Sequence, residues 1–171
     1  LSFSSGAWTD AQTYEATYAV VDGDQEGPPV KVTVSGAKDA AGNAMQPHST
    51  AEVEFSIDTL NPSVASVATV AASVELADAD VGTGVVTLDV TFDQAMDKNV
   101  LPGLTVSDGT LSGSALGLTE TAAGTWNTAG TVFTVSYDLA DVDVDMTHVE
   151  VGVSGAVDVN GNAMKPYTAA V

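Results

Sequence analysis

An internal repeat limits what this chain can fold into more than any other feature does. Residues 30–47 and 149–166 are identical at 12 of 18 aligned positions, at a constant offset of 119 residues (149 − 30). Upstream, residues 6–8 and 124–126 also match, as Gly-Ala-Trp and Gly-Thr-Trp. A repeat of roughly 110 to 120 residues has the size of an Ig-like sandwich. We therefore expect repeated copies of one small domain.

The repeat is unequally represented in the two parts of the chain. Residues 1–58 match only its second half, whereas residues 59–171 hold a complete copy. Near the boundary stands Asn61-Pro62, a dipeptide typical of turns and linkers. We therefore predict two domains: the C-terminal half of a repeat, then a complete repeat. Two origins of the half copy stay open: its missing strands precede residue 1 in a longer chain, or a neighbouring subunit donates them.

Short segments of alternating polarity predict an all-β fold. Apolar residues at 86, 88, 90 and 92 alternate with Thr and Asp, and residues 133–139 and 149–153 alternate likewise. Weaker strands are expected at residues 64–71, 100–107, 111–118 and 164–171. No segment supports a helix of more than a turn or two. We predict tandem Ig-like antiparallel β-sandwich domains, the first only partly represented.

Composition removes several classes of function. Asp and Glu number 23 against four lysines, for a formal charge of −19, so nucleic-acid binding is not expected. The chain has no cysteine, which excludes disulfides and thiolate metal sites. It also has no apolar stretch long enough to insert into a membrane.

Four phrases of the sequence carry a resemblance to a known group. They are VTFDQAMD at residues 90–97, GAWTD at 6–10, VSGAKDAAGN at 34–43 and FSIDT at 55–59. With these phrases the chain resembles the bacterial Ig-like repeats of giant surface proteins, namely Bap-like and RTX-type adhesins and SbsA-type Ig-like modules of S-layer proteins. The resemblance implies a secreted, cell-surface location, a place in cell adhesion, biofilm or S-layer structure, and calcium at the junctions between domains.

Closely spaced carboxylates favour a calcium site independently of that resemblance. Carboxylates at positions i and i+2 can point to one side and share a hard cation, which takes six to eight oxygen ligands. Three such runs occur: Asp22, Asp24 and Glu26; Asp78 and Asp80; and Asp141, Asp143 and Asp145. An EF-hand is not expected, because the sixth position of the last run is Met146 rather than glycine.

Placing these loops on a sandwich predicts a junction between domains. The loops that carry Asp78 to Asp80 and Asp141 to Asp145 are expected at one end, and those that carry Asp97 and Asp158 at the other. A complete junction would gather Asp22, Asp24 and Glu26 from the first unit, Asp58 from the linker, and Asp97 with Asp158 from the second. Simpler roles stay open: solvated loops for the runs, and turns that cap their own backbone for Asp39, Asp58 and Asp158.

No motif in the sequence favours catalysis. It contains no G-x-S-x-G, H-E-x-x-H or Gly-rich phosphate loop, and His48 and His148 are not equivalent in the repeat. Trp8 and Trp126, at matched positions, are expected to pack rather than to bind sugars. We therefore expect a non-catalytic structural or adhesive module, whose partners are neighbouring repeats or identical subunits. The alternatives are a self-assembling S-layer, sheath or fibre subunit that uses strand complementation, and a glycan-binding adhesin module.

Overall fold

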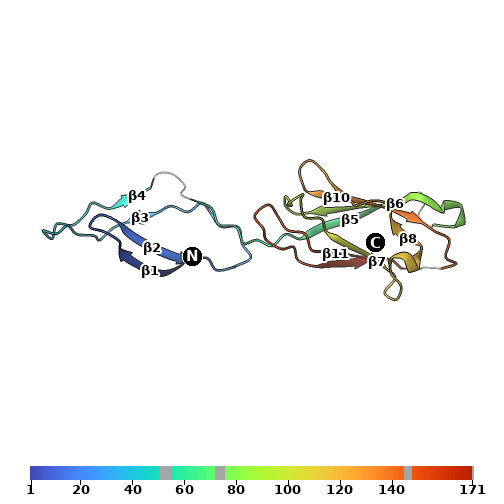
Figure 1. Ribbon diagram of the computed structural model, residues 1–171, viewed down its shortest axis with the longest axis horizontal. Coiled ribbons are helices and arrows are strands. Elements are labelled where there is room, and N and C mark those ends of the chain that lie inside the picture. The colour runs from blue at the N-terminus through green and yellow to red at the C-terminus, as the bar shows by residue number, and fades with distance from the viewer. Residues whose placement is uncertain (51–54, 72–75, 145–147, 171) are drawn as a thin grey trace. The chain divides into compact units, whose positions relative to one another are not determined.

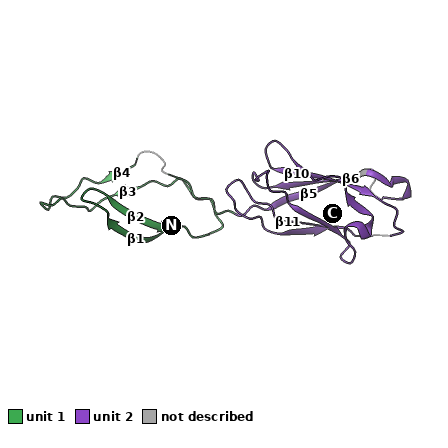
Figure 2. Ribbon diagram, viewed as in Figure 1, with its two compact units in different colours: residues 1–60 green, residues 61–171 purple. Residues whose placement is uncertain are grey.

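The computed structural model describes residues 1–50, 55–71, 76–144 and 148–170. The chain divides into two compact units, Leu1–Leu60 and Asn61–Val171 (Figure 2). Every strand pair in the described residues is antiparallel, which confirms the predicted all-β class. The helices described are two 3-10 turns, η1 (Asp78–Asp80) and η2 (Gly113–Leu116). Neither turn has the length of a membrane-spanning helix.

Unit 2 consists of two antiparallel sheets, which Figure 1 shows lying one above the other. The larger sheet has the order β5-β6-β10-β8, and β9 also pairs with β10. Its strands are β5 (Val64–Ala71), β6 (Gly82–Phe92), β8 (Leu118–Glu120), β9 (Thr125–Trp126) and β10 (Val132–Leu139). The smaller sheet has the order β12-β11-β7, formed by β7 (Gly103–Ser107), β11 (Glu150–Ser154) and β12 (Tyr167–Ala170).

The core of unit 2 lies between these sheets and follows from the alternation along the strands. Val90 of β6 stands opposite Phe133 of β10, and both side chains are buried. From the smaller sheet, Val151 and Val153 of β11 join the same apolar cluster. Because successive side chains on a strand point to opposite faces, only every second residue enters this core.

Trp126 packs in this core, as its repeat position predicts. Its ring lies 5.3 Å from the ring of Phe92 and 5.1 Å from that of Phe133, centroid to centroid. The Trp126 Nε1 atom is buried and has no hydrogen-bond partner among the described residues. The matched Trp8 is exposed instead and touches only the edge of Tyr14 among the aromatic rings described. Packing is therefore confirmed for one tryptophan and not for the other.

The strand expected over residues 111–118 is replaced by a turn. Residues 113–116 form η2, and strand structure resumes at Leu118. Gly113 and Gly117 have φ angles of 53° and 75°, which lie in the left-handed region that a continuous strand does not use. Leu116 between them is buried, so its hydrophobicity serves the core without a strand.

Unit 1 contains two separate hairpins. Strand β1 (Ser2–Trp8) pairs with β2 (Tyr14–Ala19), and β3 (Thr33–Val34) pairs with β4 (His48–Ser49). Trp8 stands opposite Tyr14, as Trp126 stands opposite Phe133 in unit 2. A Cβ added at Gly6 would collide with the Tyr14 ring, and one added at Gly124 with the Phe133 ring. Each glycine of the repeated Gly-x-Trp phrase thus makes room for the aromatic ring on the neighbouring strand.

The turns of the two units also repeat each other. Gly36 and its equivalent Gly155 have φ angles of 83° and 81°, and Gly42 and Gly161 have angles of 88° and 91°. A backbone hydrogen bond joins Met45 N–H to Ala37 O, and its equivalent joins Met164 N–H to Ala156 O. The sequence repeat is therefore a repeat of local backbone structure as well. The Ig-like character of the sandwich stays a prediction.

Candidate functional site in the acidic loops

The acidic loop of unit 1 follows β2. Asp24 has a φ angle of 50°, and its backbone N–H donates to Asp22 Oδ1 over 3.1 Å. Glu26 is the cross-strand partner of Asp58 in an isolated antiparallel bridge. Residues directly opposite each other in such a pair project to the same face. The side chains of Glu26 and Asp58 are therefore expected on one face of this ribbon.

Thr59 joins the acidic loop to the end of unit 1. Its Oγ1 accepts hydrogen bonds from the backbone N–H groups of Gly23 and Gln25, both over 3.3 Å, and donates one to Gln25 O over 3.1 Å. Asp58 Oδ1 accepts the backbone N–H of Leu60 over 2.9 Å, which is the Asx-turn considered as its simpler role. The structure thus joins the loop that carries Asp22, Asp24 and Glu26 to the segment that carries Asp58. Their predicted role as calcium ligands is untested.

Two further acidic segments lie at one end of the larger sheet of unit 2. The aspartates of η1 come just before β6, and Asp141 comes just after β10. Leu139 of β10 pairs with Gly82 of β6, which places both segments at the same end of these strands. Asp145, also predicted as a ligand, lies outside the described residues.

Within these segments some carboxylate oxygens already bond their own turns. Asp80 Oδ2 accepts the backbone N–H of Ala77 over 3.0 Å. Asp141 Oδ1 accepts the backbone N–H of Asp143 over 3.3 Å, as Asp22 does with Asp24 at the equivalent place in unit 1. Asp143 has the same φ angle of 50° as Asp24. The D-x-D spacing therefore forms one recurring turn in both units.

Asp158 is a buried carboxylate that organises a turn. Its Oδ1 accepts the backbone N–H groups of Asn160 and Asn162 over 2.8 and 2.9 Å, and its Oδ2 accepts the side-chain amides of Gln94 and Asn162 over 2.8 and 2.9 Å. A carboxylate has about four lone-pair positions. These four bonds occupy those positions, which favours a structural role for Asp158. Its predicted role as a calcium ligand stays untested.

Asp39, the equivalent of Asp158 in unit 1, makes the same turn at an exposed place. It accepts the backbone N–H groups of Ala41 and Asn43 over 2.9 and 2.8 Å, and the side-chain amide of Asn43 over 2.9 Å. The side-chain amide of Asn43, followed by its backbone N–H, lowers the pKa of Asp39 below its ordinary value. The local sequence is therefore enough to form this turn, whereas burial of the carboxylate depends on other parts of the chain.

Asp97 lies in the loop that follows β6, beside the Asp158 turn. Its backbone N–H donates to Val157 O over 2.9 Å. Its Oδ1 accepts both the backbone N–H and the side-chain amide of Asn99, over 2.9 and 2.8 Å. Asp97 thus also takes part in a local turn, and its predicted contact with calcium is untested.

Two polar residues outside the predicted calcium ligands hold this end of unit 2 together. Gln94 supplies the fourth hydrogen bond of Asp158, and Asp93 accepts the backbone N–H of Ser63 over 3.0 Å and its hydroxyl over 2.5 Å. The sequence feature that could have identified them is the pair Asp93-Gln94, which directly follows the buried end of β6. Polar side chains that directly follow a core strand are placed to bond neighbouring loops.

The described residues do not form a closed metal site. Among them, no three His, Asp or Glu side chains converge on one point that could hold an ion. Calcium takes six to eight oxygens, so an ion beside Asp22, Asp24, Glu26 and Asp58 would need further ligands from backbone carbonyls, water or another part of the chain. The calcium junction stays a prediction, and the hydrogen bonds of Asp158 make it the weakest of the predicted ligands.

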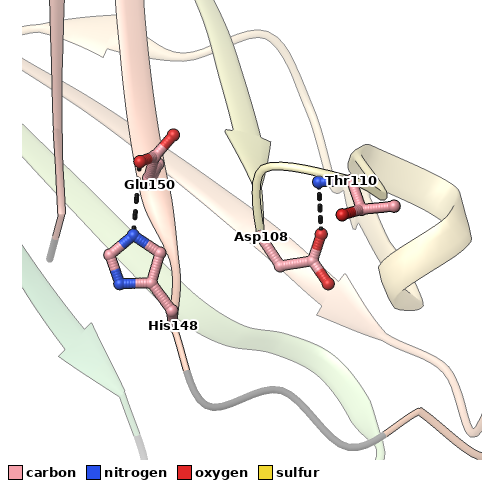
Figure 3. Close-up of polar contacts among 4 residues, drawn as sticks. All are labelled: Asp108, Thr110, His148 and Glu150. Atoms are coloured by element: carbon pink, nitrogen blue, oxygen red, sulfur yellow. Dashed lines mark hydrogen bonds and ion pairs between the residues drawn. The ribbon is translucent and has the colours of Figure 1, made fainter.

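A second polar region lies where β7 ends and β11 begins, and Figure 3 shows two separate pairs there, Asp108 with Thr110 and His148 with Glu150. Asp108 Oδ1 accepts the backbone N–H groups of Thr110 and Leu111 over 2.8 and 2.6 Å. His148 Nε2 lies 3.2 Å from Glu150 Oε1. The amide of Leu111, followed by that of Thr110, lowers the pKa of Asp108 below 3.8, and the positive charge of His148 lowers it by a smaller amount.

We expect the Asp108 carboxyl to titrate below pH 3.8 in a carbon-detected NMR titration. Because its folded pKa is the lower one, Asp108 stabilises the fold above the unfolded pKa, and this contribution is lost as pH falls through the folded pKa. In a His148→Gln variant the midpoint should rise slightly but stay below 3.8, since the backbone amides have the larger effect. A midpoint at or above 3.8 in the unaltered chain would show that the turn does not hold this carboxylate.

Comparison of the chain with protein-family models, with curated proteins and with solved structures found no match.

Proposed function

We propose that this chain is a non-catalytic structural module of a repetitive extracellular surface protein, one that works by spacing and connecting domains. The observation that carries the proposal is the repeat of local structure at an offset of 119 residues. Gly36 and Gly155, Asp24 and Asp143, and the Asp39 and Asp158 turns have matching conformations in the two units. Repetition of one sandwich unit along a chain is typical of extended arrays rather than of catalytic domains.

The short connection between the units supports a mechanical role. Thr59 N–H donates to Gln25 O within unit 1, and Lys165 N–H donates to Pro62 O within unit 2. Only Leu60 and Asn61 stand between these anchored residues. A connection this short allows far fewer arrangements than a long flexible linker. Calcium bound there would lower this freedom further.

The proposed calcium ligands are the carboxylates of unit 1 beside this connection. Glu26 and Asp58 stand directly opposite each other, and like charges at such positions repel. A divalent cation would neutralise that repulsion while bonding to both carboxylates. Asp22 and Asp24 belong to the same loop and are proposed as further ligands, and Asp97 stays a candidate from unit 2.

Calcium titration with NMR detection tests this proposal. We expect the backbone amides of Asp24, Gln25 and Thr59 to shift and to saturate at about 10⁻⁴–10⁻³ M calcium, the range of extracellular modules. At tenfold excess over Kd, binding should stabilise the folded state by about 1.4 kcal/mol in a thermal melt. Identical melts and spectra in chelator and in millimolar calcium would remove the metal from the proposal.

A paired variant locates the site. The double substitution Glu26→Gln with Asp58→Asn keeps the side-chain shapes, and Asn can still accept the Leu60 N–H. The melt in chelator should stay the same or rise slightly, because the repulsion between the two carboxylates is removed. The increment in stability that calcium produces in the thermal melt should disappear in this double variant. Asp141→Asn, at the far end of unit 2, is the matched control and should keep the full increment. Loss of the increment in the control alone would move the site to unit 2.

Self-assembly into a sheath or fibre is the alternative that a specific observation favours. No side chain in the four strands of unit 1 is buried. An exposed apolar face with open strand edges can take up strands from another molecule. Light scattering across a range of concentrations decides between the two: a mass that grows with concentration favours assembly, and a constant monomer mass favours the spacer.

A further inference from the structure

Unit 1 exposes the same positions that form the core of unit 2. Tyr14 is 50% exposed, whereas its equivalent Phe133 is 2% exposed. On β3, Val34 is 46% exposed, whereas its equivalent Val153 on β11 is 2% exposed. Because the turns beside these strands match in the two units, we attribute the difference to what lies against the strands.

Unit 2 shows what covers these positions. Strand β6 pairs along β10, with Val90 opposite Phe133, and β7 pairs along β11, with Leu104 opposite Val153. In unit 1, β2 pairs with β1 alone among the described strands, and β3 with β4 alone. The strand edges that correspond to the β6 and β7 positions are therefore open.

Exchange of strands β5, β6 and β7 between two copies of this chain does not cover every apolar face. Each copy contains one set of the strands β5, β6 and β7. Two parts of each copy need such a set to cover their apolar faces, namely unit 1 and the second half of unit 2. If the set moved from its own unit 2 into the unit 1 of a neighbour, it would expose the core residues Phe133, Val135 and Val151 in the unit that it left. Exchange between copies therefore covers one apolar face only by uncovering another.

The strand register shows where the missing set would join the chain. In unit 2, Asp138 pairs with Thr119, and in unit 1 the equivalent Ala19 pairs with Ser2. Leu1 therefore occupies the position of Leu118, which directly follows Gly117 in unit 2. A set equivalent to residues 61–117 can therefore be added before Leu1 in the register that unit 2 uses.

We infer that unit 1 is the acceptor half of a sandwich, and that its occupant is a segment equivalent to residues 61–117. Its β6 equivalent pairs with the open edge of β2, and its β7 equivalent pairs with the open edge of β3. Together they cover Tyr14, Tyr18 and Val34 as β6 and β7 cover the core of unit 2.

The occupant is expected to differ from residues 61–117 at one position. In unit 2, Asp89 of β6 stands opposite Thr134 and accepts its hydroxyl over 2.6 Å. The equivalent of Thr134 in unit 1 is Glu15. An aspartate opposite Glu15 would place two negative charges together, which destabilises a strand pair. We therefore assign a basic or neutral residue to this position of the occupant.

The test adds residues 61–117, with Asp89→Lys in the added copy, directly before Leu1 of the full chain. We expect amide hydrogen exchange in β2 and β3 to slow by at least about 100-fold, because edge amides become core amides. Trp8 emission should shift to the blue in a Trp126→Phe background, and light scattering should show a monomer. Tyr14→Ala should remove this protection in the extended chain and leave the original chain unchanged.

Two results would overturn the inference. One is unchanged exchange in β2 and β3 of an extended chain whose unit 2 keeps its native spectrum. The other is an original chain that is already dimeric with β2 and β3 protected, which would make a second copy the occupant. Leu88→Asp in the added copy alone is the matched control, and it should return β2 and β3 to fast exchange while unit 2 stays folded. Protection that survives this control would also contradict strand insertion.

Discussion

Phe133→Ala is expected to destabilise unit 2 by about 3–5 kcal/mol, the usual cost of removing a buried phenylalanine. The Phe133 ring is 2% exposed, packs against Trp126 and stands opposite Val90 in the larger sheet. Small domains are stable by only about 5–15 kcal/mol, so this loss is a large fraction of the total. Urea unfolding followed by Trp126 fluorescence, in a Trp8→Phe background, measures it.

Tyr14→Ala is the matched control for this prediction. Tyr14 is the equivalent of Phe133 in the repeat, and its neighbour Trp8 is the equivalent of Trp126. Tyr14 is half exposed, however, and lies in unit 1. Its removal should leave the unfolding midpoint of unit 2 within about 0.5 kcal/mol, as surface substitutions do. Equal effects of the two alanine variants on unit 2 would contradict the difference in burial between Tyr14 and Phe133.

Asp158→Ala is expected to destabilise unit 2 by about 3 kcal/mol, because it removes a buried carboxylate that accepts four hydrogen bonds. The donors concerned are the side-chain amides of Gln94 and Asn162 and the backbone N–H groups of Asn160 and Asn162. The loss should be the same in chelator and in calcium, since Asp158 has no free lone-pair position. Thermal melts under both conditions check this outcome.

Asp39→Ala provides the comparison within the same molecule. Asp39 makes the same three turn bonds, but at an exposed place where water can replace the lost acceptor. The substitution should change the unfolding of unit 2 by less than about 0.5 kcal/mol. A loss for Asp158→Ala that appeared only with calcium present would support the prediction that this residue binds calcium.

Local features of this protein could be predicted from the sequence because they arise within a few residues. The alternation in β6 and β10 follows from the two-residue period of a strand. The turns at Asp39 and Asp158 follow from side chains that bond backbone groups two and four residues ahead. The two-unit organisation could be inferred because the chain repeats itself. Residues 111–118 were mistaken for a strand because their apolar content did not reveal the left-handed glycines.

Only the tertiary structure determines which of two equivalent residues in the repeat is buried. Asp39 and Asp158 have the same local sequence and the same turn, yet only Asp158 is buried, where it receives a bond from Gln94, 64 residues away along the chain. Tyr14 and Phe133 alternate in the same way, yet only Phe133 has β6 beside it to exclude water. Local sequence determines which conformation a segment can adopt. Burial, and with it the choice between a metal ligand and a structural carboxylate, depends on which distant segment packs against it.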